Sequence, residues 1–196
     1  MDLYLMRHGE TDLNKQFRMQ GSVDAPLNTT GRQQASGAGK LIQKHNLTFD
    51  KVISSPLDRA QTTAELAAGI DRSRLWIDDR IREIDYGPYD GKRILTLPPK
   101  VLAFLISPHK REAPSGIETV DHLYDRVSEF LREVINRPAQ EKILVVSHGI
   151  AMRAMLGFIQ GKSSRELWKD RFSIDNCALF HVLVREQKFS EITLIN

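Results

Sequence analysis

The chain contains a single cysteine, Cys177, among its 196 residues. One thiol cannot form an internal disulfide, which fits a reducing compartment. Long hydrophobic runs are also missing: apolar stretches such as residues 101–106 are far shorter than the roughly 20 apolar residues that span a bilayer. The residues after Met1 show no charged segment followed by an apolar segment, as a secretion signal would. We therefore expect a cytoplasmic protein that does not contact a membrane.

An excess of charge of one sign is absent as well. The chain has 28 Lys and Arg against 25 Asp and Glu, a formal net charge of +3. This near balance gives no reason to expect a nucleic-acid partner. The proportions of hydrophobic (41%) and charged (27%) residues are ordinary for a globular protein and exclude a disordered or low-complexity chain. We expect one domain over residues 1–196, in an oligomeric state that the sequence leaves open.

The common metal and nucleotide motifs do not occur. There is no His-x-x-x-His or Cys-x-x-Cys spacing of the kind that binds zinc. There is also no Walker-type loop and no Gly-x-Gly-x-x-Gly fingerprint of dinucleotide-binding proteins. We therefore expect neither a metal nor an organic cofactor.

Short apolar runs alternate with longer amphipathic stretches. The runs predict strands at residues 3–6, 51–54, 75–77, 143–147, 179–184 and 192–195. The stretches predict helices near residues 30–42, 58–68, 118–135 and 150–158. This alternation is typical of an α/β fold, here a three-layer αβα sandwich with a mostly parallel central sheet. The last two strands are too close in sequence for a crossover helix, so they are expected to form an antiparallel hairpin at the C-terminus.

Residues 86–117 differ from the rest. This segment, here called the excursion, holds five of the eight prolines, and five basic residues against two acidic ones. It includes one short apolar stretch near residues 101–106, which we expect to be helical. Two interpretations stay open: a solvated loop around a packed helix, or a lid that selects the substrate.

Two histidines stand in matching contexts. Arg7-His8-Gly9 and Ser147-His148-Gly149 each follow an apolar strand. In a parallel α/β sheet the carboxyl ends of the strands meet at one edge, where ligands bind, so the two histidines could face each other. A glycine after each of them would let the backbone turn and approach a ligand.

A third strand leads into Ser54-Ser55-Pro56 and then Arg59, in the first turn of the next predicted helix. The positive helix N-terminus disfavours a cation there, so Arg59 indicates either a bound anion or an ordinary surface arginine. Arginine matches phosphate oxygens bidentately, and histidine can attack phosphorus. Arg7, Arg59, His8 and His148 together therefore predict a pocket for a phosphoryl group.

These motifs resemble those of the histidine phosphatase superfamily, in its phosphoglycerate-mutase-like branch. The resemblance covers the chain in family order, through Arg7-His8-Gly9-Glu10-Thr11, Asn14, Gln20-Gly21, Ser54-Ser55 with Arg59, Ile81 to Gly87 with Asp90-Gly91, Gly116 to Thr119, and Ser147-His148-Gly149. Ile117 and Thr119 depart from the family's Gly-Glu-Ser helix start, and Asn176 is a weak match to a later polar position.

The resemblance implies roles for these residues. It implies a nucleophile at His8, a proton donor at Glu83 and a second catalytic histidine at His148. It also implies that the phosphate is bound by Arg7, Arg59, Asn14, Gln20 and Gly21. Asp85 lies close enough in sequence to be the acid instead.

Three functions compete. The first is a metal-independent phosphatase that hydrolyses a small phosphorylated metabolite through phosphohistidine. The second is a cofactor-dependent phosphoglycerate mutase, which the resemblance connects with a longer insertion after the acid motif and an extended C-terminal tail; neither is seen here. Lys110 and Arg111, as lid residues, could nevertheless bind a substrate carboxylate. The third is a non-catalytic relative that binds a phosphorylated ligand. Such a relative would be expected to have lost His8, an arginine, His148 or Glu83, and none of these is lost here.

Overall fold

The computed structural model describes residues 1–168 and 173–196. Six strands form one sheet in the order β3-β2-β4-β1-β5-β6. They are β1 (Asp2–Arg7), β2 (Lys51–Ser54), β3 (Trp76–Ile77), β4 (Lys142–Ser147), β5 (Leu179–Arg185) and β6 (Lys188–Ile195). Every predicted strand is present, the last one beginning four residues earlier than predicted.

The first four strands of this order, β3, β2, β4 and β1, run parallel to one another. Strand β5 is antiparallel to β1, and β6 is antiparallel to β5. The β5–β6 connection is a tight turn in which Glu186 and Gln187 adopt positive φ values of 49° and 56°. Two positive φ values match the right-handed twist of a hairpin. The predicted mixed sheet and its C-terminal hairpin are confirmed.

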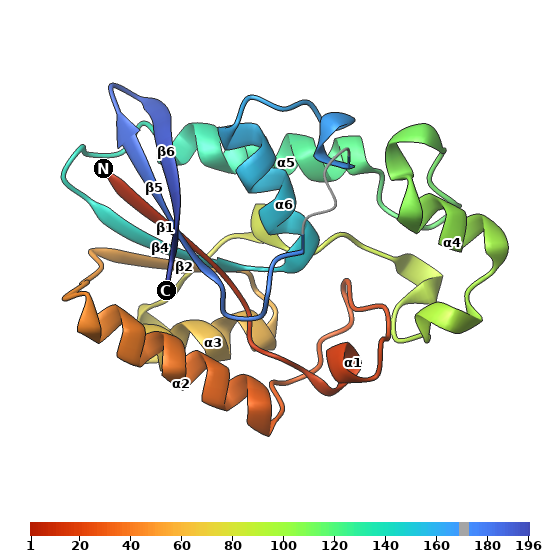
Figure 1. Ribbon diagram of the computed structural model, residues 1–196, viewed down its shortest axis with the longest axis horizontal. Helices are drawn as coiled ribbons and strands as arrows, with labels where there is room; N and C mark the ends of the chain where they lie inside the picture. The colour runs from red at the N-terminus through yellow and green to blue at the C-terminus, as the bar shows by residue number, and fades with distance from the viewer. Residues whose placement is uncertain (169–172) are drawn as a thin grey trace.

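Helices cover both faces of the sheet (Figure 1). They are α1 (Asp12–Lys15), α2 (Thr29–Lys44), α3 (Asp58–Ala68), α4 (Pro99–Ile106), α5 (Val120–Val134) and α6 (Gly149–Ile159). Short 3-10 helices lie at η1 (Arg72–Arg74), η2 (Asp79–Ile81), η3 (Gly87–Tyr89), η4 (Ile94–Thr96), η5 (Pro108–Lys110) and η6 (Glu166–Trp168). The helices α2 and α3 pack on one face and α5 and α6 on the other, which confirms the three-layer sandwich.

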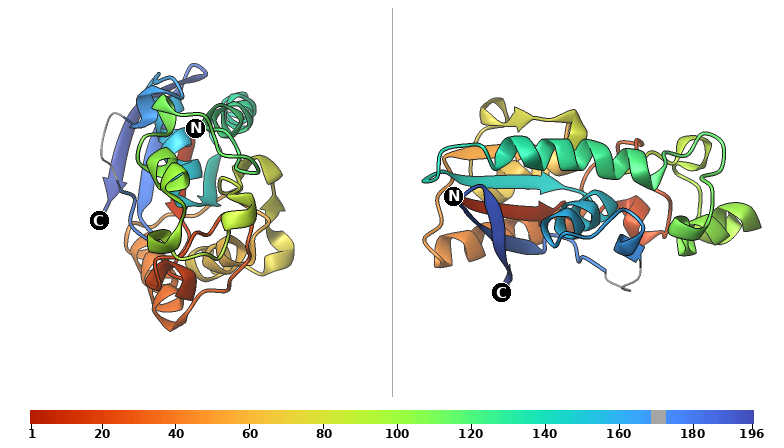
Figure 2. Two further views of the ribbon diagram at one scale, coloured as in Figure 1. Left: turned by 90° about the vertical axis from the view of Figure 1, so that its right-hand side faces the viewer. Right: turned by 90° about the horizontal axis from the view of Figure 1, so that it is seen from above.

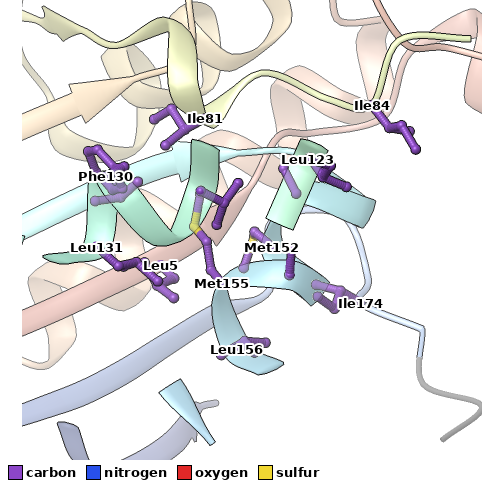
Figure 3. Close-up of a cluster of buried hydrophobic side chains, with 14 of the residues drawn as sticks. Leu5, Ile81, Ile84, Leu123, Phe130, Leu131, Met152, Met155, Leu156 and Ile174 are labelled. Atoms are coloured by element: carbon purple, nitrogen blue, oxygen red, sulfur yellow. The ribbon is translucent and has the colours of Figure 1, made fainter. Parts of the chain in front are cut away.

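Side chains alternate between these two faces because successive residues of a strand point in opposite directions. Leu3 and Leu5 of β1 join the core beneath α5 and α6, whereas Tyr4 and Met6 join the core beneath α2 and α3. Figure 3 shows Leu5 among side chains of the first core, which come from α5, α6 and neighbouring segments. Both faces of β1 are thus buried, which is why it appears in the sequence as an uninterrupted apolar run.

The excursion lies beyond the carboxyl ends of the parallel strands. In Figure 1 it holds α4 at the end of the molecule opposite to the N-terminus, and in the left view of Figure 2 it stands in front of the sheet. The predicted short helix is present as α4, with Pro99 at its first position. Whether the excursion moves as a lid stays a prediction. Within the described residues, no helix is long and apolar enough to cross a membrane.

Candidate active site

Three neighbouring strands end at one edge of the sheet, and each leads into a residue of interest. β1 continues into His8, β4 into His148, and β2 into Ser55. The His8 N–H donates to the carbonyl of Ser147 at 2.9 Å, which extends the β1–β4 pairing by one residue. The rings of His8 and His148 lie 5.1 Å apart between centroids, edge to face. The structure therefore brings the two histidines together.

Arg59 is fully buried, so it is not a surface residue of α3. Its Nε donates to Nδ1 of His148 at 3.2 Å, and its terminal nitrogens donate to the carbonyls of Gly21 and Val23, each at 2.8 Å. A guanidinium carries five N–H groups, so two remain for a ligand. Arg59 thus connects one histidine to the Gly21–Val23 loop.

The carboxylate of Asp24, which is 34 residues away in sequence, lies at the start of α3 next to the cation of Arg59. The backbone N–H of Asp58 donates to both carboxylate oxygens of Asp24, at 3.0 and 2.9 Å. The N-cap residue Leu57 makes no side-chain cap of its own. Asp24 therefore supplies the negative charge that a helix N-terminus favours, next to Arg59.

The hydrogen bonds of His8 fix its tautomer. Its Nδ1 lies 2.7 Å from the carbonyl oxygen of Gly9, which can only accept, so Nδ1 carries the proton. The lone pair then resides on Nε2, the nitrogen able to attack an electrophile. Burial, followed by the nearby cations Arg59 and Arg7, holds the pKa of His8 well below its usual value. The ring is therefore neutral at physiological pH.

His148 is neutral for the same reasons. Burial and then the charge of Arg59 hold its pKa well below the usual value. Arg59 can only donate, so Nδ1 of His148 accepts and Nε2 carries the proton. That N–H donates to Oγ of Ser55 at 2.7 Å. Ser55, His148 and Arg59 thus form one continuous hydrogen-bonded chain.

A polar cavity of about 280 Å³ is lined by Arg7 and Gly149, the chain neighbours of His8 and His148, whereas His8, His148 and Arg59 are buried and are not among its lining residues. Its lining includes the predicted site residues Arg7, Asn14, Gln20 and Glu83, together with Gly149. We call it the polar cavity. Two buried N–H donors among its lining residues, Nε of Arg7 and Nε2 of Gln20, have no hydrogen-bond partner. Unpaired buried donors are costly, so these atoms point to an oxygen-rich ligand.

The other groups of these side chains are held firmly. Arg7 donates from a terminal nitrogen to the carbonyl of Ile174 at 2.5 Å, and the Oε1 of Gln20 accepts from the hydroxyl of Thr11 at 2.7 Å. The side-chain oxygen of Asn14 accepts from the N–H of Thr11 at 3.2 Å and closes a capping box on α1. One polar group of each side chain is thus held within the protein, while Nε of Arg7 and Nε2 of Gln20 find no partner among the described residues.

Glu83 accepts three backbone hydrogen bonds, two of them from the start of α6. Its Oε1 receives the N–H groups of Ile84 and Ala151, both at 3.0 Å, and its Oε2 receives that of Ile150 at 3.1 Å. Neither Arg80 nor Arg82 pairs with it; within the described residues they bond to Asp78, Glu133 and Asp79 instead. Glu83 is thus fixed by the backbone in the wall of the polar cavity.

The two glycines that follow the histidines have different surroundings. A Cβ on Gly9 would lie 2.5 Å from the carbonyl oxygen of Gly31, so this glycine permits contact between two backbones rather than approach to a ligand. A Cβ on Gly149 would instead lie 3.5 Å from Nε of Arg7 and 3.7 Å from Oε2 of Glu83. Only Gly149 keeps the space between these two groups open.

Asp90 anchors the Gly21–Val23 loop. Its carboxylate accepts the N–H groups of Gly21, Ser22 and Val23, at 2.6, 2.9 and 3.3 Å. The backbone of Gly21 is therefore occupied on both sides, with its N–H on Asp90 and its carbonyl on Arg59. The sequence includes Asp90 in a motif but gives no sign of this role, because the contact joins segments 69 residues apart.

Three predicted candidates lie away from the polar cavity. Asp85 accepts the N–H of Gly87 at 2.7 Å in a local turn and lines a different surface cavity. Lys110 and Arg111 line a third cavity, of about 370 Å³, together with Glu112 and Asp121. This third cavity shares no lining residue with the polar cavity, so Lys110 and Arg111 do not line the same cavity as Arg7, Gln20 and Glu83.

Two further side chains, of Asn176 and Thr63, bind the backbone of His8 and Gly9. The side-chain nitrogen of Asn176 donates to the carbonyl of His8 at 2.8 Å, and the hydroxyl of Thr63 accepts the N–H of Gly9 at 3.0 Å. Asn176 is the weak match noted in the sequence, and Thr63 has no sequence signal beyond its place in a helix. Within the described residues, no group of three or more His, Cys, Asp or Glu side chains is placed to hold a metal ion.

Comparison with known proteins adds to this geometry. A family model described as histidine phosphatase superfamily (branch 1) matches residues 3–196. A curated protein of Salmonella choleraesuis (strain SC-B67), named probable phosphoglycerate mutase GpmB, is 31% identical over 193 residues, which cover 96% of this chain and 87% of that protein.

Solved structures share the fold. A putative alpha-ribazole-5'-P phosphatase from Escherichia coli has a TM-score of 0.87 at 24% identity, with 100% of this chain and 96% of that chain covered. A phosphoserine phosphatase from Entamoeba histolytica, in complex with 3-phosphoglyceric acid, has a TM-score of 0.82 at 23% identity, with 100% and 96% covered. With the family match over nearly the whole chain, the protein belongs to branch 1 of the histidine phosphatase superfamily.

Proposed function

We propose that this protein is a phosphatase that hydrolyses small phosphate monoesters through a phosphohistidine on His8. The observation that carries the proposal is the pair of unpaired buried donors, Nε of Arg7 and Nε2 of Gln20, in the cavity that Glu83 also lines. A phosphoryl group offers these donors the oxygen acceptors they lack. The neutral His8 beside them is the matching nucleophile.

The reaction has two steps. Nε2 of His8 forms a bond to phosphorus while the bond from phosphorus to the ester oxygen breaks, and Glu83 gives its proton to the departing alkoxide. A water molecule then attacks the phosphohistidine, Glu83 takes a proton from this water, and phosphate and neutral His8 are regenerated. Arg7 and Arg59 stabilise the negative charge on the phosphoryl oxygens in both steps, and His148 orients Arg59 by accepting its Nε–H.

Glu83 is the better acid on its position. It lines the same cavity as Arg7 and Gln20, whereas Asp85 is engaged in the turn with Gly87 and does not line that cavity. The backbone hydrogen bonds of Glu83 also hold it at a fixed place next to Gly149. A fixed acid needs no reorganisation when the leaving oxygen arrives.

The runner-up is a phosphoglycerate mutase, which the name of the Salmonella relative favours. A mutase must bind the carboxylate of phosphoglycerate and return the phosphoryl group to it. The pair Lys110 and Arg111, which the sequence offers for that carboxylate, lines a cavity separate from the polar cavity. This separation supports water as the acceptor.

A single assay separates the two functions. The protein is incubated with 3-phosphoglycerate and a bisphosphoglycerate primer, and both inorganic phosphate and 2-phosphoglycerate are followed. We expect phosphate to form faster than 2-phosphoglycerate. Isomerisation faster than hydrolysis would establish the mutase, and phosphate release from no ester at all would leave a non-catalytic binding protein.

A further inference from the structure

A second cavity, of about 330 Å³, borders the polar cavity. Its walls are apolar, and among the described residues no charged side chain lines it. Its lining includes Ile94, Leu102 and Leu105 from the excursion, together with Ile150 and Trp168. We call it the apolar chamber. Its volume is within the range of about 300–1,000 Å³ typical of small-molecule sites.

The two cavities share a wall on the side of Glu83. Met19, Tyr86, Ile94 and Ile150 line both of them. Ile150 also donates its backbone N–H to Oε2 of Glu83 at 3.1 Å. The apolar chamber therefore begins beside the group that faces the leaving oxygen, which is where the alcohol part of a bound ester would extend.

The excursion leaves this apolar surface incompletely covered. Leu102 and Leu105 of α4 are only half-buried, and Ile106 next to them is 76% exposed. An apolar group on the alcohol of a bound ester would find a large, partly uncovered apolar surface here.

We infer that the apolar chamber binds the alcohol part of the substrate. The preferred substrates are then phosphate monoesters whose alcohol carries an aromatic or bulky apolar group, rather than phosphates of small polyols or hydroxy acids. This inference rests on the proposed phosphatase function, and it assigns specificity to the apolar side chains of α4 and to Trp168.

The test uses esters with similar leaving groups. Propyl phosphate and 3-phenylpropyl phosphate both release an unactivated primary alkoxide, so their chemistry is alike and only the apolar extension differs. Burial of the added phenyl ring should raise kcat/KM for the phenylpropyl ester about ten- to a hundredfold over the propyl ester. Glycerol 1-phosphate and 3-phosphoglycerate should react no faster than propyl phosphate.

Two variants locate the effect. Leu105→Asp places a charge in the wall of the apolar chamber and should bring the phenylpropyl-to-propyl ratio close to one. Leu95→Asp is the matched control, since Leu95 lies in the same excursion but is 91% exposed, and it should keep the wild-type ratio. If Leu105→Asp fails to fold, the wild-type ratio still decides.

Each outcome is informative. A wild-type ratio near one, or a preference for 3-phosphoglycerate, overturns the inference while leaving the phosphatase intact. Phosphate release from no ester contradicts the proposed function, and the chamber is then tested by calorimetric binding of the corresponding phosphonates. Tighter binding of 3-phenylpropylphosphonate than of propylphosphonate supports the chamber, and equal binding overturns it.

Discussion

The polar cavity and the excursion border the same space but are built in different ways. In the polar cavity, backbone groups and side chains hold each reactive residue by several hydrogen bonds, as Glu83 is held by three N–H groups. The excursion contributes Asp90 to that network, but its helix α4 presents half-buried apolar side chains to the apolar chamber. Chemistry needs fixed atoms, whereas accommodation of an alcohol needs only a surface of suitable shape.

The largest loss of activity is expected from a change at the nucleophile proposed beside the polar cavity. His8→Ala removes the nucleophile and should lower phosphate release from any ester by at least about 10⁴-fold, as removal of a nucleophile does in other covalent enzymes. His122→Ala is the control, because His122 has a side chain 70% exposed and pairs with Glu118. Steady-state turnover of p-nitrophenyl phosphate measures both variants. Substantial residual activity in His8→Ala would remove His8 from the reaction path.

Glu83→Gln should separate substrates by their leaving groups. An alkoxide, whose parent alcohol is about as weak an acid as water, needs a proton as it leaves, whereas nitrophenolate does not. Proton donation is worth about 10²- to 10⁴-fold, so single-turnover phosphorylation of His8 by an alkyl phosphate should slow by that factor, and by p-nitrophenyl phosphate far less. Ile150 and Ala151 donate to different oxygens of Glu83, so glutamine keeps an acceptor for only one of these N–H groups, and the ratio between the two esters decides rather than either rate alone.

Asp85→Asn is the matched control for this prediction and should show no such selectivity. The assignment of the acid would be reversed if Asp85→Asn discriminated between the two esters and Glu83→Gln slowed them equally. Single-turnover measurement is required because Glu83 also acts in the second step of the proposed reaction.

The same contrast decides which parts of the site can be predicted from the sequence. His8, Arg59 and His148 are recognisable because each follows a strand end and its chemistry restricts the residue type. The positions of the strands along the chain and the three layers follow from apolar runs and amphipathic stretches, whereas the order of the strands in the sheet does not. The sequence does not reveal the contact of Asp90 with the Gly21–Val23 loop or the separation of Lys110 and Arg111 from the polar cavity. Both depend on how distant loops meet in space.

A change at Asp90 tests how much activity depends on the loop that holds Arg59 in place. Asp90→Asn replaces an acceptor oxygen by a donor facing the N–H groups of Gly21, Ser22 and Val23, so the loop that holds Arg59 should shift. We expect kcat/KM to fall about ten- to a hundredfold, with a parallel loss of affinity for vanadate. Asp79→Asn, on an exposed side chain paired only loosely with Arg82, should change neither. Unchanged vanadate affinity in Asp90→Asn would show that the loop tolerates the loss.

The smallest expected effect is a change in the free energy of unfolding with pH. Both His8 and His148 have pKa values held well below the unfolded value of about 6.5, so below that pH the unfolded chain takes up protons that the folded protein does not. The free energy of unfolding should therefore fall on acidification below about pH 6.5, by up to about 1.4 kcal/mol per pH unit for each histidine. In His148→Gln the slope should decrease by about one proton, as measured by urea unfolding at several pH values. An unchanged slope would mean that His148 is protonated in the folded protein.

The most direct test of the account is the identity of the phosphorylated residue. The protein is mixed with a radiolabelled phosphate ester, quenched within one turnover, and digested at alkaline pH to preserve phosphohistidine. The account predicts an acid-labile, alkali-stable phosphoryl group on His8. Phosphate on Ser54, Ser55 or His148 would contradict it.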